Sequence, residues 1–159
     1  MRLLLLPILL VMPACSPQAA ERAPAPAAQG ASVHPVSGLQ VIPLTVTSLG
    51  KTHEFRVEVA LTAQEQARGL MFRTAMGPNE GMLFPYDQPR VLSFWMKNTV
   101  LSLDLIFIGP DRRVINVAAN AVPYSEESIL SDAPAIATLE LNAGRAKELG
   151  IVAGARVDW

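Results

Sequence analysis

The chain has 159 residues, half of them hydrophobic, and its 13 Lys and Arg against 14 Asp and Glu give a formal net charge of −1 at pH 7. This length suffices for one domain, and the absence of a basic run argues against a nucleic-acid partner. With one Cys and two His in the whole chain, the sequence excludes a disulfide framework, a thiolate or His-based metal site, and a Ser-His-Asp triad. It holds no phosphate-binding Gly-rich loop, so we expect no cofactor and no metal.

The first 15 residues have the pattern of an export signal. Met1-Arg2 is a short positive region, and Leu3 to Met12 is an apolar stretch too short to span a bilayer core of about 30 Å. The stretch leads into Met12-Pro13-Ala14-Cys15, which is similar to a lipobox, where the Cys is acylated and becomes the new N-terminus. We therefore predict a signal peptide over 1–15, lipidation of Cys15, and a membrane partner reached through that lipid; an ordinary secretory signal cleaved nearby is the alternative. Ser16 after the Cys favours the outer membrane of a Gram-negative envelope.

Residues 16–37 are rich in Ala and Pro and nearly free of large apolar side chains. Such a segment cannot form a core, and in a polyproline-like conformation it would extend roughly 70 Å at ~3.1 Å per residue. We interpret it as a tether that carries a single domain, residues 38–159, on the periplasmic side of a bacterial membrane.

The start of the domain predicts a hairpin followed by a short helix. Residues 39–47 alternate loosely, and residues 53–60 alternate cleanly between apolar and charged side chains, as in two strands covered on one face. Thr62-Ala63-Gln64-Glu65 is a capping box that opens a helix, and Gly69 can end it. Residues 77–81 have the composition of a turn.

The rest of the domain predicts more strands and a second short helix. Consecutive strands are expected over 82–86, 91–96, 101–108 and 113–118, an irregular flap over 120–134, and further strands over 136–141 and 155–159. Asn142 is the expected N-cap of a helix over 143–149 that Gly150 closes. About eight short strands with two short helices indicate a mainly β fold, either a β-sandwich or a distorted barrel.

Three segments carry a resemblance to a known family. They are Arg68-Gly69-Leu70-Met71-Phe72-Arg73, Gly81-Met82-Leu83-Phe84, and Phe94-Trp95-Met96-Lys97-Asn98-Thr99 running into Leu103 to Ile108. Together they resemble the bacterial and archaeal family called domain of unknown function 192, over about Val41 to Val157. The resemblance implies a β-sandwich or barrel with a site near these segments, and it implies no particular reaction.

Asp104 is the most prominent candidate site residue. Its strand is apolar on both faces, so the carboxylate is expected to be partly buried and to need a cationic or hydrogen-bonding partner. Lys97, Arg68 and Arg73 are the expected partners, in a polar cleft where Asp104 acts as a base or anchors a ligand. The alternative is a structural ion pair that ties the helix to the sheet.

Trp95 is expected to face outward if Phe94 and Met96 enter the core, and a flat exposed side chain beside Lys97 and Asn98 suits a sugar or another planar ligand. Alternatively Trp95 belongs to the core and Asn98 to a turn. The candidate ligand-binding residues are Arg68, Arg73, Trp95, Lys97, Asn98 and Asp104, and no catalytic residue is assigned.

Glu140 is the second candidate carboxylate. Alternation places it with Ile136 and Thr138, and a half-exposed face is the simpler account. A pair of Asp104 and Glu140 would suit glycoside cleavage, but spacing along the chain does not give a distance in space.

These observations predict an extracytoplasmic, membrane-tethered binding or accessory domain for a small polar molecule or an envelope glycan. The glycan rests on fold analogy alone. One alternative is a hydrolase that uses Asp104 with Lys97 or an Arg, and another is an envelope assembly or structural protein.

Overall fold

The structure is a computed structural model that describes residues 32–159. The predicted signal peptide, the lipidation site Cys15 and most of the Ala/Pro-rich tether therefore lie outside the described residues. Within residues 32–159 no helix has both the length and the apolar character needed to cross a membrane.

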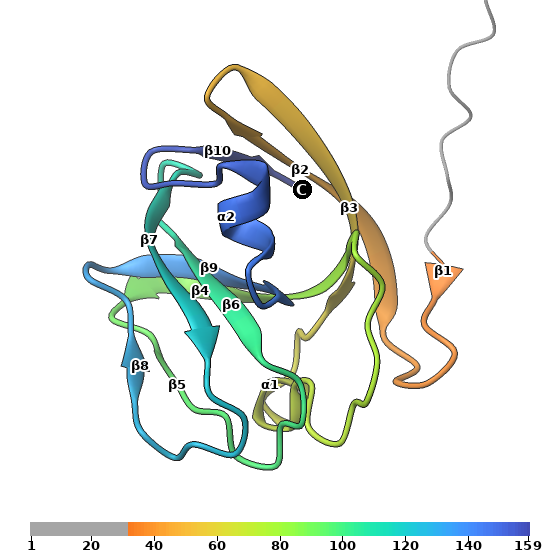
Figure 1. The fold of residues 1–159 in the computed structure, drawn as a ribbon. Coiled ribbons are helices and arrows are strands. Elements are labelled where there is room, and N and C mark those ends of the chain that lie inside the picture. Colours follow the sequence, from red (N-terminus) through yellow and green to blue (C-terminus); the bar gives the residue numbers. More distant parts are fainter. Residues whose placement is uncertain (1–31) are drawn as a thin grey trace, which may run out of the picture.

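The fold is mainly β, as predicted (Figure 1). Its elements are β1 (Ser32–Val33), β2 (Gln40–Ser48), β3 (Lys51–Val59), α1 (Ala63–Arg68), β4 (Glu80–Arg90), β5 (Ser93–Phe94), β6 (Leu103–Ile108), β7 (Val114–Ala121), β8 (Ile129–Leu130), β9 (Ala135–Asn142), α2 (Arg145–Leu149) and β10 (Arg156–Asp158). The two strands that the sequence did not predict, β1 and β8, have two residues each. Two residues are too few to show a period in hydrophobicity.

One large sheet runs in the order β1-β2-β3-β4-β9-β6-β7, with β10 also paired to β2. The β3–β4 pair is parallel, with α1 in the connection between its strands, and the other pairs in the sheet are antiparallel. An isolated bridge between Arg113 and Arg156 brings the start of β7 to β10. The sheet thus curves round into a distorted barrel that continuous strand pairing does not close (Figure 1).

Several local predictions are confirmed. β2 and β3 form the expected hairpin, in register from Val41↔Glu58 to Ser48↔Lys51. The capping box is present, because the Thr62 hydroxyl accepts from the Glu65 amide and the Glu65 carboxylate accepts from the Thr62 amide. Gly69 ends α1 with a φ of 45°.

Two local predictions are wrong. The expected strand over 91–96 shrinks to β5, which pairs with β8 in a separate two-stranded sheet and not with β6. The N-cap of α2 is Gly144 and not Asn142. The Asn142 amide instead donates to the carbonyls of Met76 and Gly77, at 3.0 Å each, and so ties β9 to the loop before β4.

The folded region extends into residues that the sequence assigned to the tether. β1 pairs with β2 through Ser32↔Val41 and Val33↔Gln40, and the His34 amide donates to the Leu39 carbonyl at 2.8 Å. The described chain therefore contacts the domain from Ser32 onward.

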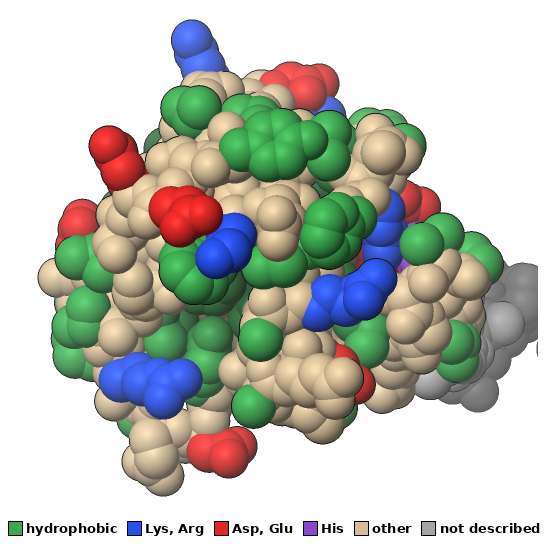
Figure 2. All heavy atoms as spheres, turned by 90° about the horizontal axis from the view of Figure 1, so that it is seen from below, with side chains coloured by type: hydrophobic (Ala, Val, Ile, Leu, Met, Phe, Trp, Pro, Cys, Tyr) green, Lys and Arg blue, Asp and Glu red, His purple; other side chains and the backbone are tan. Residues whose placement is uncertain are grey.

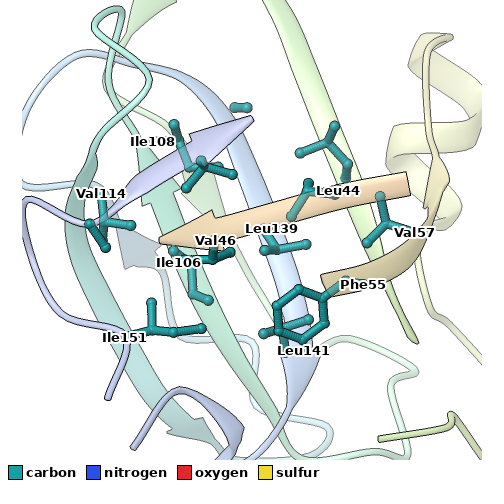
Figure 3. Packing of buried hydrophobic residues seen from close by; sticks show 14 of the residues in the cluster. Leu44, Val46, Phe55, Val57, Ile106, Ile108, Val114, Leu139, Leu141 and Ile151 are labelled. Carbon is teal, nitrogen blue, oxygen red and sulfur yellow. The ribbon is translucent and has the colours of Figure 1, made fainter. Parts of the chain in front are cut away.

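Two hydrophobic cores lie on opposite faces of β4, β9 and β6. The first contains Leu139 and Leu141 of β9 with Ile106 and Ile108 of β6, and it packs against β2, β3, α2 and the C-terminal strand (Figure 3). The second contains Met82, Phe84, Leu103, Leu105 and Phe107. Because side chains alternate between the faces of a strand, every residue of β6 is buried in one core or the other. Each large side chain buried in this way contributes roughly 1.5–3 kcal/mol to folding.

Candidate functional site

The predicted site residues lie in different parts of the molecule. Asp104 is completely buried, and its register partner on β9 is Leu141, so it lies on the face of the first core. The Asp104 carboxylate accepts hydrogen bonds from three backbone amides. Oδ1 accepts from Asn120 at 2.9 Å and from Gly144 at 3.0 Å, and Oδ2 accepts from Ala146 at 2.9 Å.

Asp104 therefore caps α2 from a neighbouring strand. The Gly144 and Ala146 amides belong to the first turn of the helix, where N–H groups lack partners within the helix. The sequence predicted a buried carboxylate with a cationic or hydrogen-bonding partner, and three backbone N–H groups supply the hydrogen bonds that a buried carboxylate requires. The predicted cleft shared with Lys97, Arg68 or Arg73 is wrong, because none of these cations contacts Asp104.

Arg73 also lies apart from the other predicted residues, in an ion pair with Glu58 of β3. Its guanidinium donates to both Glu58 carboxylate oxygens, at 2.9 and 3.0 Å, and Glu58 is only 4% exposed. The Ser37 hydroxyl donates to the same carboxylate, and His34 Nε2 lies 3.6 Å from Glu58 Oε1. This cluster joins the loop after α1 to β3 and to the N-terminal segment.

Arg68, Trp95 and Lys97 do converge, around a pocket of about 470 Å³ between α1, β4, β5 and β9. Arg68 and Trp95 are exposed and Lys97 is half-buried, while Phe84, Phe94 and Glu140 lie deeper. Two of the elements that line the pocket, α1 and β5, lie at the lower end of the barrel in Figure 1. Figure 2 shows this end, where the surface is hollowed, hydrophobic side chains line the hollow, and Lys or Arg side chains lie at its margin. The volume lies within the range of small-molecule sites.

The aromatic wall of the pocket is built by close packing. The Phe94 ring meets Phe84 edge to face at 5.1 Å between centroids, and Phe107 at 6.0 Å. A Cβ on Gly69 would lie 3.3 Å from the Phe84 ring. Gly69 thus allows the end of α1 to approach this ring, which explains the Gly in the Arg68-to-Arg73 segment.

The turn over residues 95–99 holds the mouth of the pocket. The Met96 amide donates to the Ser125 carbonyl at 2.8 Å, and the Asn98 carbonyl accepts from the Phe72 amide at 2.9 Å. Asn98 has a φ of 54°, a conformation that Asn tolerates better than most residues. Asn98 thus lies in a turn that connects the loop after α1 to the loop before β8.

Trp95 faces outward, as expected from the burial of Met96, and is 51% exposed. Lys97 Nζ lies 5.2 Å from the centroid of the Trp95 ring, within the range of a cation–π contact. The same ammonium is 3.8 Å from Glu126 Oε1, and the Lys97 and Glu126 side chains are 43% and 64% exposed. The interaction energy of such a solvent-exposed ion pair is small.

Glu140 is the residue of the pocket that the sequence placed wrongly. It was expected on a half-exposed face, but it is only 5% exposed, beside Met82 of β4 and Leu105 of β6 in the second core. Burial raises the pKa of Glu140 from its ordinary 4.5 to about 8. Within residues 32–159 its side chain has no hydrogen bond or ion pair, and it lines the pocket.

The backbone around Glu140 is tightly constrained. A Cβ on Gly81 would lie 2.5 Å from the Glu140 carbonyl oxygen, so only Gly fits where β4 pairs with this part of β9. On β4, Tyr86 also lines the pocket. Burial raises the pKa of the Tyr86 hydroxyl, the nearby Arg90 guanidinium lowers it, and the Glu140 charge raises it further.

Asp104 and Glu140 do not form a catalytic pair. They lie on adjacent strands, but Asp104 is opposite Leu141 and Glu140 is opposite Leu105, which places them on opposite faces of the sheet. Across the described part of the chain, no group of three or more His, Cys, Asp or Glu side chains is placed to hold a metal ion.

Comparison with known proteins places this architecture in a family. The sequence pattern of DUF192, described as an uncharacterized ACR, matches residues 44–159. The chain belongs to the DUF192 family. The matched region includes α1, the turn over 95–99 and Glu140, so the whole pocket lies within the DUF192 domain.

The solved structures that are similar to this chain include two crystal structures of bacterial proteins. One is a protein of unknown function from Novosphingobium aromaticivorans DSM 12444, with 51% identity and a TM-score of 0.81 over 87% of this chain and 100% of that one. The other, from Sinorhizobium meliloti 1021, is described as a candidate transcription regulator and has 40% identity and a TM-score of 0.74 over 76% of this chain and 94% of that one. No functionally curated protein matches the chain.

Proposed function

We propose that this protein is a lipid-tethered binding module on the periplasmic side of a bacterial membrane, and that a small polar ligand, such as an envelope glycan or a fragment of one, binds in the pocket between α1, β4, β5 and β9. The observation that carries the proposal is the pairing of an exposed Trp95 at the mouth with a buried Glu140 that has no partner among the described residues. A flat aromatic surface suits the face of a sugar ring, and an uncompensated polar group inside a pocket offers a directional hydrogen bond.

The unpartnered carboxyl in the pocket favours a role in ligand binding over a structural role. A buried carboxyl without a partner lowers the stability of the folded state. Because such a carboxyl does not help the protein to fold, its position beside a cavity suggests that it binds a ligand. Asp104, the buried carboxyl on the adjacent strand β6, has all its hydrogen bonds inside the domain, and we assign it no ligand.

The charge of this chain does not favour transcription regulation, the role in the description of the relative from Sinorhizobium meliloti. From Gly38 to Trp159 the chain has eleven Lys and Arg against thirteen Asp and Glu, a net charge of −2. A DNA-binding domain ordinarily presents a basic face to the phosphates.

The rival function, hydrolysis, would have to use Glu140 in place of Asp104. A carboxyl with a pKa near 8 is protonated at neutral pH and can act as a general acid. Loss of a glycan substrate over time, at a rate that falls at least tenfold in Glu140→Gln, would favour this rival. Reversible binding without turnover is the result that we expect.

Binding can be measured through Trp95 alone. The chain has two Trp residues, and the second, Trp159, stacks on Arg112 at 3.6 Å. In a Trp159→Phe protein the remaining fluorescence reports the mouth of the pocket. We expect envelope glycan fragments or small polar metabolites to change this fluorescence and to raise the Tm, and Trp95→Ala to abolish the rise in Tm. A broad panel without any shift that depends on Trp95 would contradict the proposed function.

The membrane attachment has a separate test. Cys15→Ser removes the predicted acylation site, and because Cys15 precedes the described domain by the length of the linker, the Tm of the domain should not change. The protein should leave the membrane fraction, since each buried CH₂ of an acyl chain contributes about 0.8 kcal/mol to membrane binding. If Cys15→Ser protein stays with membranes after a high-salt wash, the lipid anchor is not the means of attachment.

A further inference from the structure

The charges around the pocket are arranged unevenly from its mouth to its floor. Arg68 from α1 and Lys97 from the turn over 95–99 line the pocket and reach solvent, whereas Glu140 lies at the buried end. Among the described residues, Arg68 has no hydrogen bond or ion pair. The contacts of Lys97 are the Trp95 face and an exposed Glu126 at 3.8 Å. Both cations are therefore available to a ligand.

From this arrangement we infer that the ligand is an acidic sugar, whose anionic group lies at the mouth between Arg68 and Lys97, whose ring lies against Trp95 and Phe94, and whose far end presents a hydrogen-bond acceptor to Glu140. The inference rests on the proposed function and narrows its ligand class. A carboxylate or a phosphate satisfies the same cations, so the shared chemistry is a sugar with one anionic group.

The inner end of the pocket favours an acceptor over a cation. An ammonium at this depth would lose its water and would need an ionised Glu140, so two charges would be desolvated together. The protonated carboxyl instead has one O–H to donate, and it suits a ligand hydroxyl or carbonyl oxygen. The raised pKa of Glu140 agrees with this form at neutral pH.

In the described chain, few other titratable or charged groups surround Glu140 in the pocket. The titratable and charged side chains that face the pocket are Tyr86 of β4, Arg68 and Lys97, while Met82 and Leu105 flank Glu140 on the neighbouring strands. The Arg90 guanidinium lies over the Tyr86 ring, 4.5 Å from its centroid. The difference between the pH profiles of the wild type and of Glu140→Gln therefore isolates the contribution of Glu140 to binding.

The experiment compares three methyl glycosides that differ in one group: glucoside, glucuronide and glucoside 6-phosphate. Each is titrated into the Trp159→Phe protein at pH 7, with Trp95 fluorescence and calorimetry as readouts. We expect the glucuronide or the 6-phosphate to bind at least tenfold more tightly than the neutral glucoside. The two acidic probes distinguish a carboxylate ligand from a phosphate ligand.

Two variants test the cations at the mouth of the pocket, and a third tests Glu140 at its buried end. Arg68→Gln and Lys97→Gln should each weaken the acidic probe by about five- to tenfold and leave the neutral glucoside unchanged. Lys51→Gln, which removes an exposed Lys that does not line the pocket, is the matched control and should have no effect. Affinity of the wild type should fall by more than threefold as the pH rises from 7 to 9, and Glu140→Gln, which keeps a donor that cannot ionise, should flatten this change.

The possible results distinguish failure of the acidic-sugar assignment from failure of the proposed binding function. Equal binding of all three glycosides would overturn the acidic-sugar assignment and leave the binding function standing. Tighter binding of a fourth probe, a glucoside that carries a quaternary ammonium group, with affinity that increases from pH 7 to 9, would overturn it in favour of a cation at Glu140. No binding by any probe, together with no Trp95-dependent shift in the broader panel, would overturn both.

Discussion

Asp104 and Glu140 are two buried carboxyls on adjacent strands of one sheet, and they differ in almost every respect except burial. Asp104 is 0% exposed and Glu140 is 5% exposed. Asp104 accepts from three backbone amides on the face of the first core. Glu140 lies on the opposite face, lines a pocket and has no partner in residues 32–159.

The contrast teaches that the hydrogen-bonding state of a buried carboxyl says more about its role than its depth. A buried polar group is normally satisfied within the protein, and Asp104 follows this rule as a helix cap. A buried carboxyl that lacks such a hydrogen bond and lies beside a cavity is a candidate ligand-binding or catalytic group. Four substitutions test how far the contrast holds.

The largest effect is expected for Asp104→Asn. An amide has one acceptor oxygen, so at least one of the three backbone N–H groups would face an NH₂ group and lose its acceptor. We expect the free energy of unfolding to fall by about 3 kcal/mol and the Tm to fall by about 10 °C. Thermal unfolding measures both quantities, with Asp87→Asn on the exposed part of β4 as the control. A fall of less than about 2 °C would mean that the cap is unimportant for stability.

Glu140→Gln should raise the free energy of unfolding, in contrast to Asp104→Asn, and the size of the increase should depend on pH. The pKa of Glu140 is raised from 4.5 to about 8 in the folded state. The folded protein therefore binds one proton more than the unfolded chain between these values, and rising pH lowers the stability of the wild type by up to about 1.4 kcal/mol per pH unit there. The Glu140→Gln protein does not lose stability in this way, because a Gln side chain does not ionise. It should be more stable than the wild type by about 2 kcal/mol at pH 6, and the difference should grow as the pH rises and shrink toward zero near pH 4.5.

Urea unfolding at pH 5, 6.5 and 8 checks this prediction. Glu127→Gln, a change at an exposed carboxyl, is the matched control and should show no dependence of this kind. A Glu140→Gln protein less stable than the wild type at pH 8 would imply that Glu140 has a structural partner, and the contrast with Asp104 would disappear.

Arg73→Gln tests a third buried carboxyl, Glu58, which is satisfied by a side-chain cation. Loss of the guanidinium leaves the Ser37 hydroxyl and the nearby His34 around the carboxylate. We expect the free energy of unfolding to fall by about 1–2 kcal/mol, less than for a buried pair that loses every partner. Arg156→Gln, which breaks an exposed pair with Asp158, is the control and should leave the urea midpoint unchanged. An equal response in both variants would show that burial of Glu58 adds nothing to its pair.

The smallest effect is expected for Thr138→Val, two residues from Glu140 on the same face of β9. The Thr138 hydroxyl is fully buried and has no hydrogen-bond partner in the described region. Replacing it with a methyl group of similar size should raise the free energy of unfolding by about 0.5–1 kcal/mol. Thr47→Val, which removes a hydroxyl bonded to Thr52 at 3.0 Å on the surface, should not stabilise the protein. A loss of stability in Thr138→Val would point to a hydrogen bond made in solution.

Much of the fold was predictable because it depends on local patterns. The alternation in residues 53–60 predicted β3, and the spacing of Thr62 and Glu65 predicted the start of α1. These signals depend on neighbours in the sequence. The Asn142 cap failed because the real cap of α2 comes from Asp104, on another strand, and no local pattern carries that information.

The site was predicted in part, for a related reason. Outward-facing Trp95 and its neighbour Lys97 could be read from alternation within one segment. The burial of Glu140 could not, because it depends on how α1, β4 and β5 enclose the pocket around β9. A signal was nevertheless present: in Ile136-Ala137-Thr138-Leu139-Glu140-Leu141 the carboxyl is the one charged group in an apolar strand. Glu140 was named as the second candidate carboxylate, but burial was predicted only for Asp104, although both residues lie in strands of the same apolar kind.

The cap that Asp104 provides also bears on the order of folding. Its donors are 16, 40 and 42 residues away along the chain, and α2 has only five residues. So short a helix is not stable by itself in water, since nucleation costs more than the few bonds it gains. We therefore expect α2 to form late, after β6 has joined the sheet. Destabilising changes confined to α2 should accelerate unfolding while leaving the refolding rate nearly unchanged.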